Sequence, residues 1–291
     1  MNNLQIYVLV TVAKNEGSNL PLLIQSVIKQ TIKPILWVIV NDGSTDNTQD
    51  ILTKTNEKYK WIHIIRLEEG KRDVGFHLSS MMKNAFDFTV GLCGRKGINY
   101  EYLGNIDGDI SIEPAFFEKL IKEFEKDPNL GIAGSGTCYL KKNRIIQPQL
   151  NPDEPSGGDI LIKRKCFEDC GGILVSCCWD SVLKVKARLR GYKTRRFESI
   201  KAFESRDFGE IEGWRRYIHK GRSDYHLNNS LIYVIFKSIS LLFKYPYFIG
   251  FMYSLGYFKA LIRRENQIDD VEIKNYYRTK WKILLKYRLK T

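Results

Sequence analysis

Residues 103–110 read Leu-Gly-Asn-Ile-Asp-Gly-Asp-Ile, an apolar run that leads to two carboxylates, Asp107 and Asp109, separated by one glycine. Side chains two positions apart in an extended chain point the same way, so both carboxylates can face one ligand, and Gly108 lets the backbone come close to it. Neighbouring carboxylates repel unless a cation lies between them. Mg²⁺ or Mn²⁺ prefers oxygen ligands and often joins carboxylates to phosphates, so the stretch predicts a metal and phosphate site. A solvated turn is the alternative.

The composition is that of a folded globular protein, and 291 residues suffice for one large domain or a domain with an appendage. The formal net charge of +13 indicates an anionic partner, such as nucleic acid, an anionic membrane or a phosphorylated substrate. Ten Lys/Arg against four Asp/Glu from Lys259 onward favour a basic docking tail. Six cysteines without zinc spacing, and an N-terminus without a secretion pattern, predict a cytoplasmic protein with reduced thiols.

Apolar, β-branched runs at 5–12, 36–40, 61–67 and 100–106 alternate with segments of helical pattern, including one at 78–88. This alternation predicts an α/β fold with a mainly parallel sheet flanked by helices. In such sheets ligands bind beyond the carboxyl ends of the strands. Polar clusters follow the first, second and fourth runs at 15–16, 41–42 and 107–109, so we expect them along one edge of the sheet.

The middle of the chain adds a helix at 114–126, a strand at 131–140 and a short apolar strand at 160–162. Gly157 and Gly158 precede that last strand and allow a ligand to approach the backbone closely. After a short helix at 164–170, Trp179 and Asp180 open a helix that closes at Gly191. An acid at a helix start is often only a cap.

Together these motifs resemble the family 2 glycosyltransferases, inverting enzymes with the GT-A fold. The resemblance rests on Lys14-Asn15-Glu16, on the block Asn41-Asp42-Gly43-Ser44-Thr45-Asp46, on Asp107-Gly108-Asp109, and on the segment from Ser156-Gly157-Gly158 to Trp179-Asp180. These motifs cover roughly residues 5–197, about two thirds of the chain. The Asp-x-Asp pair by itself is weak evidence for this family, whereas the block after the second strand is a specific signal.

The resemblance implies a set of donor contacts. The acid matching Asp42 binds the nucleotide base, Glu16 lies along the nucleoside with Asn15 beside it, and the Asp107–Asp109 pair holds ribose and metal-bound diphosphate. Candidates for contacts with the donor sugar are Gly157, Gly158 and Trp179. Lys71 and Arg72 are candidate cations for the phosphates, with plain surface solvation as the alternative for each.

The resemblance also assigns the chemistry. Asp180 matches the general base, a carboxylate that takes the proton of an acceptor hydroxyl as the hydroxyl attacks the anomeric carbon. Mg²⁺ or Mn²⁺ is expected on Asp109, with Asp107 beside it. Relatives carry a histidine where this chain has Glu204, so Glu204 is the candidate third metal ligand. His219 and His226 are the other candidates.

The C-terminal part is read as a helical extension, residues 226–291, after a catalytic domain of residues 1–225. Its longest run without charge, 245–258, has 14 residues, fewer than the about 18 to 20 that span a bilayer. We therefore expect two helices joined at 244–246 that lie on an anionic membrane surface. Packing against the sheet or in a homodimer is the alternative.

The resulting expectation is an inverting glycosyltransferase, peripheral on the inner face of the cell membrane. It would move a sugar from a nucleotide diphosphate donor to a glycan or lipid-linked acceptor, as in polysaccharide biosynthesis. A nucleotidyltransferase is the enzymatic rival, but residues 11–17 lack its glycine-rich phosphate loop. A basic nucleic-acid-binding protein would explain the charge but not the acidic clusters, so we expect no nucleic-acid partner.

Overall fold

The computed structural model describes residues 7–68, 76–141, 144–205 and 213–288, and it leaves out the side chains of 140–141 and 283–288. The chain divides into two compact units, residues 1–207 and 208–291. The boundary that we expected at 225–226 falls at the end of helix α8 (Arg215–His226). That helix belongs to the second unit and packs on α10 (Ile249–Ile262).

A seven-stranded sheet forms the centre of the first unit, in the order β10-β6-β9-β4-β1-β2-β3. Its neighbours pair in parallel except at β9, which runs antiparallel to both β4 and β6. The mainly parallel sheet predicted from the sequence is therefore confirmed. The strands are β1 (Tyr7–Ala13), β2 (Leu36–Asp42), β3 (Ile62–Leu67), β4 (Tyr102–Ile106), β6 (Leu130–Ser135), β9 (Asp159–Lys163) and β10 (Lys193–Phe197).

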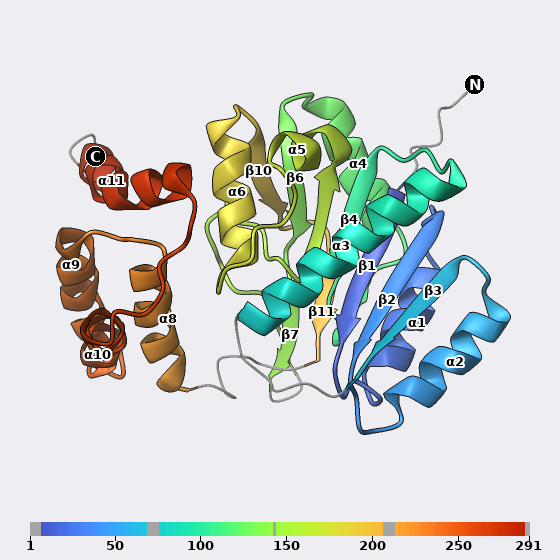
Figure 1. The fold of residues 1–291 in the computed structure, drawn as a ribbon, viewed down its shortest axis with the longest axis horizontal. Coiled ribbons are helices and arrows are strands. Elements are labelled where there is room, and N and C mark those ends of the chain that lie inside the picture. The colour runs from blue at the N-terminus through green and yellow to red at the C-terminus, as the bar shows by residue number, and fades with distance from the viewer. Residues whose placement is uncertain (1–6, 69–75, 142–143, 206–212, 289–291) are drawn as a thin grey trace. The chain divides into compact units, whose positions relative to one another are not determined.

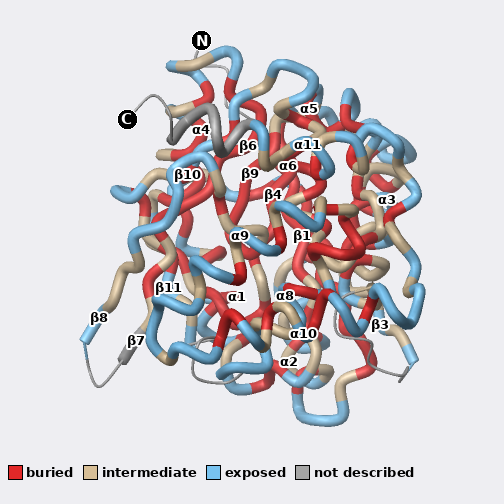
Figure 2. Tube along the Cα trace, turned by 90° about the vertical axis from the view of Figure 1, so that its left-hand side faces the viewer, coloured by how far each residue is buried: buried red, intermediate tan, exposed pale blue. Residues whose placement is uncertain are grey.

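Each central strand buries both of its faces, which explains why the sequence shows continuous apolar runs there. Along β1, Tyr7 and Leu9 enter one hydrophobic core, whereas Val8 and Val10 enter a second core on the opposite face. This follows from the alternation of side chains along a strand. The central strands are correspondingly red, meaning buried, in Figure 2.

Helices cover both faces of the sheet. The first core is closed by α1 (Leu20–Ile28), α2 (Thr48–Lys58) and α4 (Phe116–Lys126). The second core is closed by α3 (Phe76–Lys96), α5 (Arg164–Asp169) and α6 (Trp179–Leu189). Figure 1 shows the long helix α3 crossing one face of the strands. Two helical layers around a mainly parallel sheet confirm the predicted fold class, although α3 is longer than the expected 78–88.

The strand expected at 131–140 is two strands that belong to different sheets. It breaks after β6 at Gly136, where a Cβ atom would lie 2.8 Å from Cα of Glu198, so a larger residue would force that backbone to shift. The chain then enters a second sheet of four strands in the order β5-β11-β7-β8. Its strands are β5 (Ile110–Ile112), β7 (Cys138–Lys141), β8 (Arg144–Ile146) and β11 (Ala202–Glu204).

The second unit contains α8, α9 (Leu231–Leu242), α10 and α11 (Val271–Arg288), drawn orange to red in Figure 1. Two glycines bring α8 and α10 into contact, because a Cβ on Gly221 would lie 2.0 Å from the Tyr253 carbonyl oxygen and one on Gly256 2.1 Å from that of Ile218. The two helices expected on either side of 244–246 are confirmed as α9 and α10. Within the described residues, every helix is too short or too polar to cross a membrane.

Candidate active site

The loops that follow β1 and β2 are tied together by hydrogen bonds from backbone N–H groups to side-chain oxygens. The Asn15 N–H donates to Oγ of Ser44 at 2.9 Å, and Oδ1 of Asn15 accepts from the Thr45 N–H at 2.8 Å. The Glu16 N–H donates to Oγ1 of Thr48 at 2.9 Å. Asn15 holds a positive φ of 56°, which asparagine tolerates better than most residues. The Asn15 side chain thus fixes the loop, and its donor contact stays a prediction.

Asp42 ends β2 and is held by two basic side chains. Nε2 of His77, in the first turn of α3, lies 2.9 and 2.8 Å from the two carboxylate oxygens, and Nζ of Lys14 lies 3.6 Å from Oδ2. His77 was not predicted as a site residue, because no local sequence pattern ties it to Asp42, 35 positions earlier.

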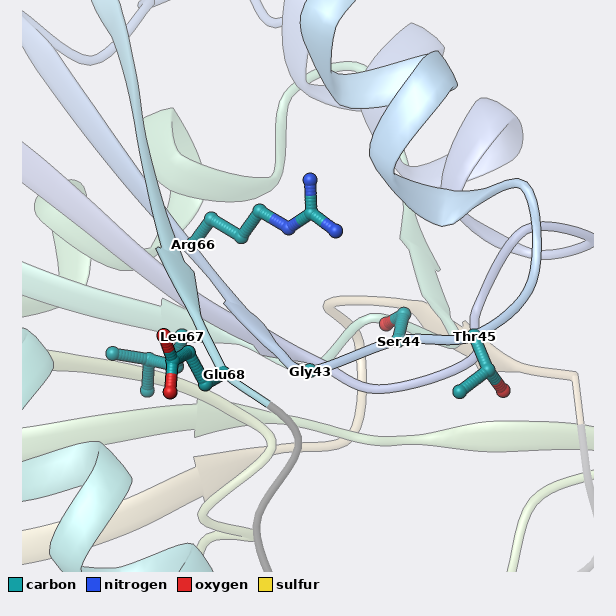
Figure 3. A pocket seen from close by; sticks show the side chains of 6 residues that line it. All are labelled: Gly43, Ser44, Thr45, Arg66, Leu67 and Glu68. Atoms are coloured by element: carbon teal, nitrogen blue, oxygen red, sulfur yellow. The ribbon is translucent and has the colours of Figure 1, made fainter.

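A pocket of about 580 Å³ opens beside Asp42, at the carboxyl ends of β2 and β3. Figure 3 shows its lining residues, with Arg66 extending from β3 on one side and the loop of Ser44 and Thr45 on the other. This volume is within the usual range for small-molecule sites. The lining residues are Gly43, Ser44, Thr45, Arg66, Leu67 and Glu68.

Asp107 lies where β4 ends, among other acids. The pKa of Asp107 is raised to about 6, mainly by burial; the charges of Asp109, Asp180 and Glu16 act in the same direction, and a hydrogen bond from Asn105 opposes them. That bond, from Nδ2 to Oδ1, measures 2.9 Å. The carboxylates of Asp109, Asp180 and Glu16 are therefore each close enough to Asp107 to repel its charge. Asn105 was not predicted as a site residue, although a polar residue in an apolar strand next to the paired acids could have indicated such a role.

Gly157 and Gly158 form a thin piece of backbone between Asp107 and Asp180. A Cβ on Gly158 would lie 2.6 Å from Oδ2 of Asp107, and one on Gly157 would lie 2.7 Å from Cβ of Asp180. The Gly158 carbonyl accepts from the Asp107 N–H at 2.8 Å, and that of Gly157 accepts from Nδ2 of Asn105 at 2.8 Å. Any larger residue would push one of the two acids out of place.

Glu16 joins this group from the loop after β1. A Cβ on Gly108 would lie 3.0 Å from Cγ of Glu16, so the glycine of the Asp-Gly-Asp stretch leaves room for that side chain. Oε2 of Glu16 accepts from Nδ2 of Asn19 at 2.8 Å. The expected convergence of the polar clusters on one edge of the sheet is confirmed for Glu16, Asp107 and Asp109.

Asp180 lies in the first turn of α6 and pairs with Lys184, one turn later. Nζ of Lys184 is 3.0 Å from Oδ2 of Asp180, 2.8 Å from the Pro155 carbonyl oxygen and 3.4 Å from Oε2 of Glu154. Lys184 is buried while Asp180 keeps partial exposure. Lys184 was not predicted as a site residue, although its i, i+4 spacing from Asp180 on one helix face could have indicated the pair.

Two other predicted site residues, Trp179 and Glu204, lie in positions that do not favour the expected contacts. Trp179 is buried in the second core, with its ring centroid 6.4 Å from that of Phe86. Its ring packs against Gly157, where a Cβ atom would lie 3.2 Å from it. Glu204 pairs with Ile110 across β11 and β5, whereas Ser205 donates its N–H to the Asp109 carbonyl. Paired residues share a face of the sheet, so the side chain of Glu204 lies on the same face as that of Ile110. The side chain of Asp109, one position before Ile110, is therefore directed to the opposite face.

Lys71 and Arg72, the candidate phosphate cations, lie outside the described residues. Among the residues that are described, no group of three or more His, Cys, Asp or Glu is arranged to hold a metal. A third ligand from Glu204 therefore stays a prediction that the strand register does not favour.

The acids present nevertheless fit a divalent cation. Asp107 and Asp109 offer carboxylate oxygens, the ligand type that Mg²⁺ and Mn²⁺ prefer. Asp107 is destabilised by burial and by like charges, and a cation there would remove that cost. The residues that would hold the metal are therefore Asp107 and Asp109.

Known proteins share sequence motifs and the fold with this chain. The family model described as glycosyl transferase family 2 matches residues 8–179, which include every acid named above except Asp180 and Glu204. A chondroitin synthase from Pasteurella multocida (strain Pm70) is 29% identical over 125 residues, which are 43% of this chain and 11% of that protein. The chain thus matches a small part of that much longer relative.

Two solved structures share the fold at low sequence identity. The mannosyltransferase PcManGT from Pyrobaculum calidifontis, in complex with GDP-Man and Mn²⁺, has a TM-score of 0.54 and 14% identity, over 97% of this chain and 82% of its own. GalNAc-T7 with UDP, GalNAc and Mn²⁺ has a TM-score of 0.56 and 14% identity, over 99% of this chain and 59% of its own.

Proposed function

Because the chain belongs to glycosyltransferase family 2, we propose that it moves a sugar from a nucleotide diphosphate donor to an acceptor hydroxyl with inversion at the anomeric carbon. The observation that carries this proposal is the arrangement around Gly157 and Gly158, with Asp107 against one glycine and Asp180 against the other. Inversion needs the leaving group and the base on opposite sides of the reacting carbon. A sugar seated against these two glycines would have Asp107 toward its diphosphate and Asp180 toward the acceptor.

The donor nucleoside is proposed to lie along the edge formed by the loops after β1 and β2. Asp42, fixed by His77 and Lys14, would accept hydrogen bonds from the base, and the pocket next to it supplies the space. Glu16 would lie along the nucleoside, since its side chain lies beside Gly108. The diphosphate then reaches Asp107 and Asp109, where a divalent cation when bound would balance the charge of the departing phosphate.

Asp180 is proposed as the general base. As the acceptor oxygen forms its bond to the anomeric carbon, its proton passes to a carboxylate oxygen of Asp180 and the bond to the nucleoside diphosphate breaks. Lys184 acts as a positioning residue, because its buried amine holds Oδ2 of Asp180 and is itself fixed by the Pro155 carbonyl. The second carboxylate oxygen is then directed toward the acceptor.

The acceptor is proposed to be a glycan or a lipid-linked sugar. The names of relatives support a polymer-building role, since they include a chondroitin synthase and a poly-β-1,6-N-acetyl-D-glucosamine synthase from Staphylococcus epidermidis. Family membership argues against the nucleotidyltransferase and the nucleic-acid-binding rivals. The base of the donor and its sugar are set by pocket shape, and a screen of nucleotide sugars would identify both.

The test compares Asp180→Asn with Asp87→Asn, an exposed acid of α3 as the matched control. Once a donor is identified by calorimetry with Mn²⁺, transfer to a glycan acceptor is measured with both variants. The Asp180 variant should bind donor within about twofold of wild type while transfer falls about 10²- to 10⁴-fold. Loss of donor binding, or unchanged transfer, would show that Asp180 has another role.

A further inference from the structure

The exposed apolar side chains of this protein are concentrated in one segment. Within the described residues, 15 of the 25 exposed large hydrophobic side chains lie in residues 231–262. Scattered exposed hydrophobic residues are normal, but a concentration of this kind marks an interaction surface. The segment comprises α9, α10 and the connection between them.

The exposed side chains form a stripe on each helix. On α9 and α10 they recur at helical spacing, at Ile232, Ile235, Phe236, Ile239 and Leu242, then at Phe251, Leu255, Phe258 and Ile262. We call these two stripes, together with residues 243–248, the hairpin face. Such spacing normally turns an apolar stripe toward a core.

The core of the second unit uses the other sides of these helices. Val234 of α9 packs with Tyr253, Tyr257 and Ala260 of α10 in a buried cluster. The hydroxyl of Ser254 donates to Oγ of Ser238 at 2.7 Å, which joins one turn of α9 to one turn of α10. The hairpin face is thus left over after the unit has built its core.

The connection between the helices carries aromatic side chains at its tip. Phe243 is 80% exposed, Tyr245 85% and Tyr247 64%. Tyrosine and other amphipathic aromatics are enriched where a protein meets the boundary between lipid headgroups and acyl chains, because the ring is apolar and the hydroxyl can stay hydrated.

The charges in the segment that carries the hairpin face have one sign. Between Asp224 and Glu265 the chain has five basic residues and no acidic one. Lys237 turns to pair with Asp224, whereas the other four, Lys244, Lys259, Arg263 and Arg264, are exposed. Exposed cations around an apolar face are complementary to anionic lipid headgroups. They would repel a second copy of the same face across a two-fold axis.

We propose that the hairpin face docks on an anionic lipid bilayer, with the aromatic tip and both stripes in the headgroup boundary and the four cations on the headgroups. The helices lie on the bilayer and do not cross it: at about 1.5 Å per residue, the 12 residues of α9 and 14 of α10 are too short for a hydrocarbon layer of about 30 Å. This inference goes beyond glycosyl transfer and does not depend on it.

The test is co-sedimentation of the full-length protein with vesicles of phosphatidylcholine, with and without phosphatidylglycerol. The tip variant Phe243→Ser/Tyr245→Ser should bind mixed vesicles at least tenfold more weakly than wild type. The control Leu22→Ser/Leu150→Ser, which changes two exposed apolar residues of the first unit, should bind like wild type. Circular dichroism and melting curves confirm that each variant is folded.

A second variant tests the electrostatic part. Arg263→Gln/Arg264→Gln should lose most of the preference for phosphatidylglycerol and most of the sensitivity to salt. The proposal is wrong if wild-type protein does not bind anionic vesicles, or if a folded tip variant binds them as tightly as wild type. A wild-type dimer in ultracentrifugation that the tip variant makes monomeric, without vesicle binding, would assign the face to a second copy. Transfer to a soluble acceptor should be unchanged in the tip variant, so this test is separate from that of the proposed function.

Discussion

Replacing Gly157 by alanine should disable transfer through a displacement that the structure allows us to estimate. The new Cβ would lie 2.7 Å from Cβ of Asp180 and 3.2 Å from the ring of Trp179, whereas ordinary contacts begin at 3.4 Å. Trp179 is packed in the core, so the side chain of Asp180 must move by about 0.7 Å, the difference between 2.7 and 3.4 Å. A misplacement of this size near reacting groups can lower the rate about 10²-fold.

The assay is steady-state kinetics with parallel measurement of donor affinity. We expect kcat of Gly157→Ala to fall about 10²-fold while donor binding through Asp42 changes little. The matched control is Gly94→Ala on α3, where a Cβ would have no atom within 4 Å. If kcat of Gly157→Ala stayed within twofold of wild type, the proposed closeness of this backbone to the reacting acid would be refuted.

Three further predictions concern the charges around this site. Lys184→Met should lower kcat about tenfold to 10²-fold with KM for the donor unchanged, whereas Lys184→Arg recovers part of the loss; a fall in melting temperature with normal kcat would mean that Lys184 is only structural. Asp109→Ala should abolish Mn²⁺-dependent nucleotide binding in calorimetry, and an unchanged titration would contradict its role. Burial raises the pKa of Asp159 to about 7, so the native state favours the protonated carboxyl. Up to about 4 kcal/mol of the free energy of unfolding is therefore lost as the pH rises from about 4 through 7. In urea unfolding at pH 5 and pH 8, wild type should therefore lose more stability than Asp159→Asn, and equal losses would argue against this pKa.

The sheet and the edge that carries the acids followed from the sequence because both depend on local signals. Continuous apolar runs mark strands that are buried on both faces, and parallel strands all end at the same edge. Asp107 and Glu16 could therefore be placed together although 91 positions separate them in the sequence. Gly157 and Gly158 were recognised as points of close approach, and the structure adds which atoms they approach.

Other features depend on partners that are remote in the sequence. The break at Gly136 follows from Gln147 and Glu198, which occupy the space of its missing side chain. The pairing of His77 with Asp42 requires α3 to start beside the end of β2, which no periodicity predicts. The antiparallel direction of β9 likewise depends on its two neighbours and not on its own residues.

The C-terminal helices illustrate a different limit. Apolar spacing predicted α9 and α10 correctly, but spacing alone does not say which stripe faces the core. The structure resolves this: Val234 and Tyr253 pack inside the second unit, whereas Phe236 and Phe251 stay exposed. A sequence with apolar residues on most sides of a helix leaves that choice to the packing of the neighbouring helices.

The most direct test of the account is crystallography of the protein with its donor nucleotide and Mn²⁺, with the metal located by its anomalous signal. We predict one manganese ion on the carboxylates of Asp107 and Asp109, the base beside Asp42, and an open approach from Asp180 to the sugar position on the side away from the diphosphate. A metal and nucleotide bound elsewhere, or a sugar position that Asp180 cannot reach, would contradict it.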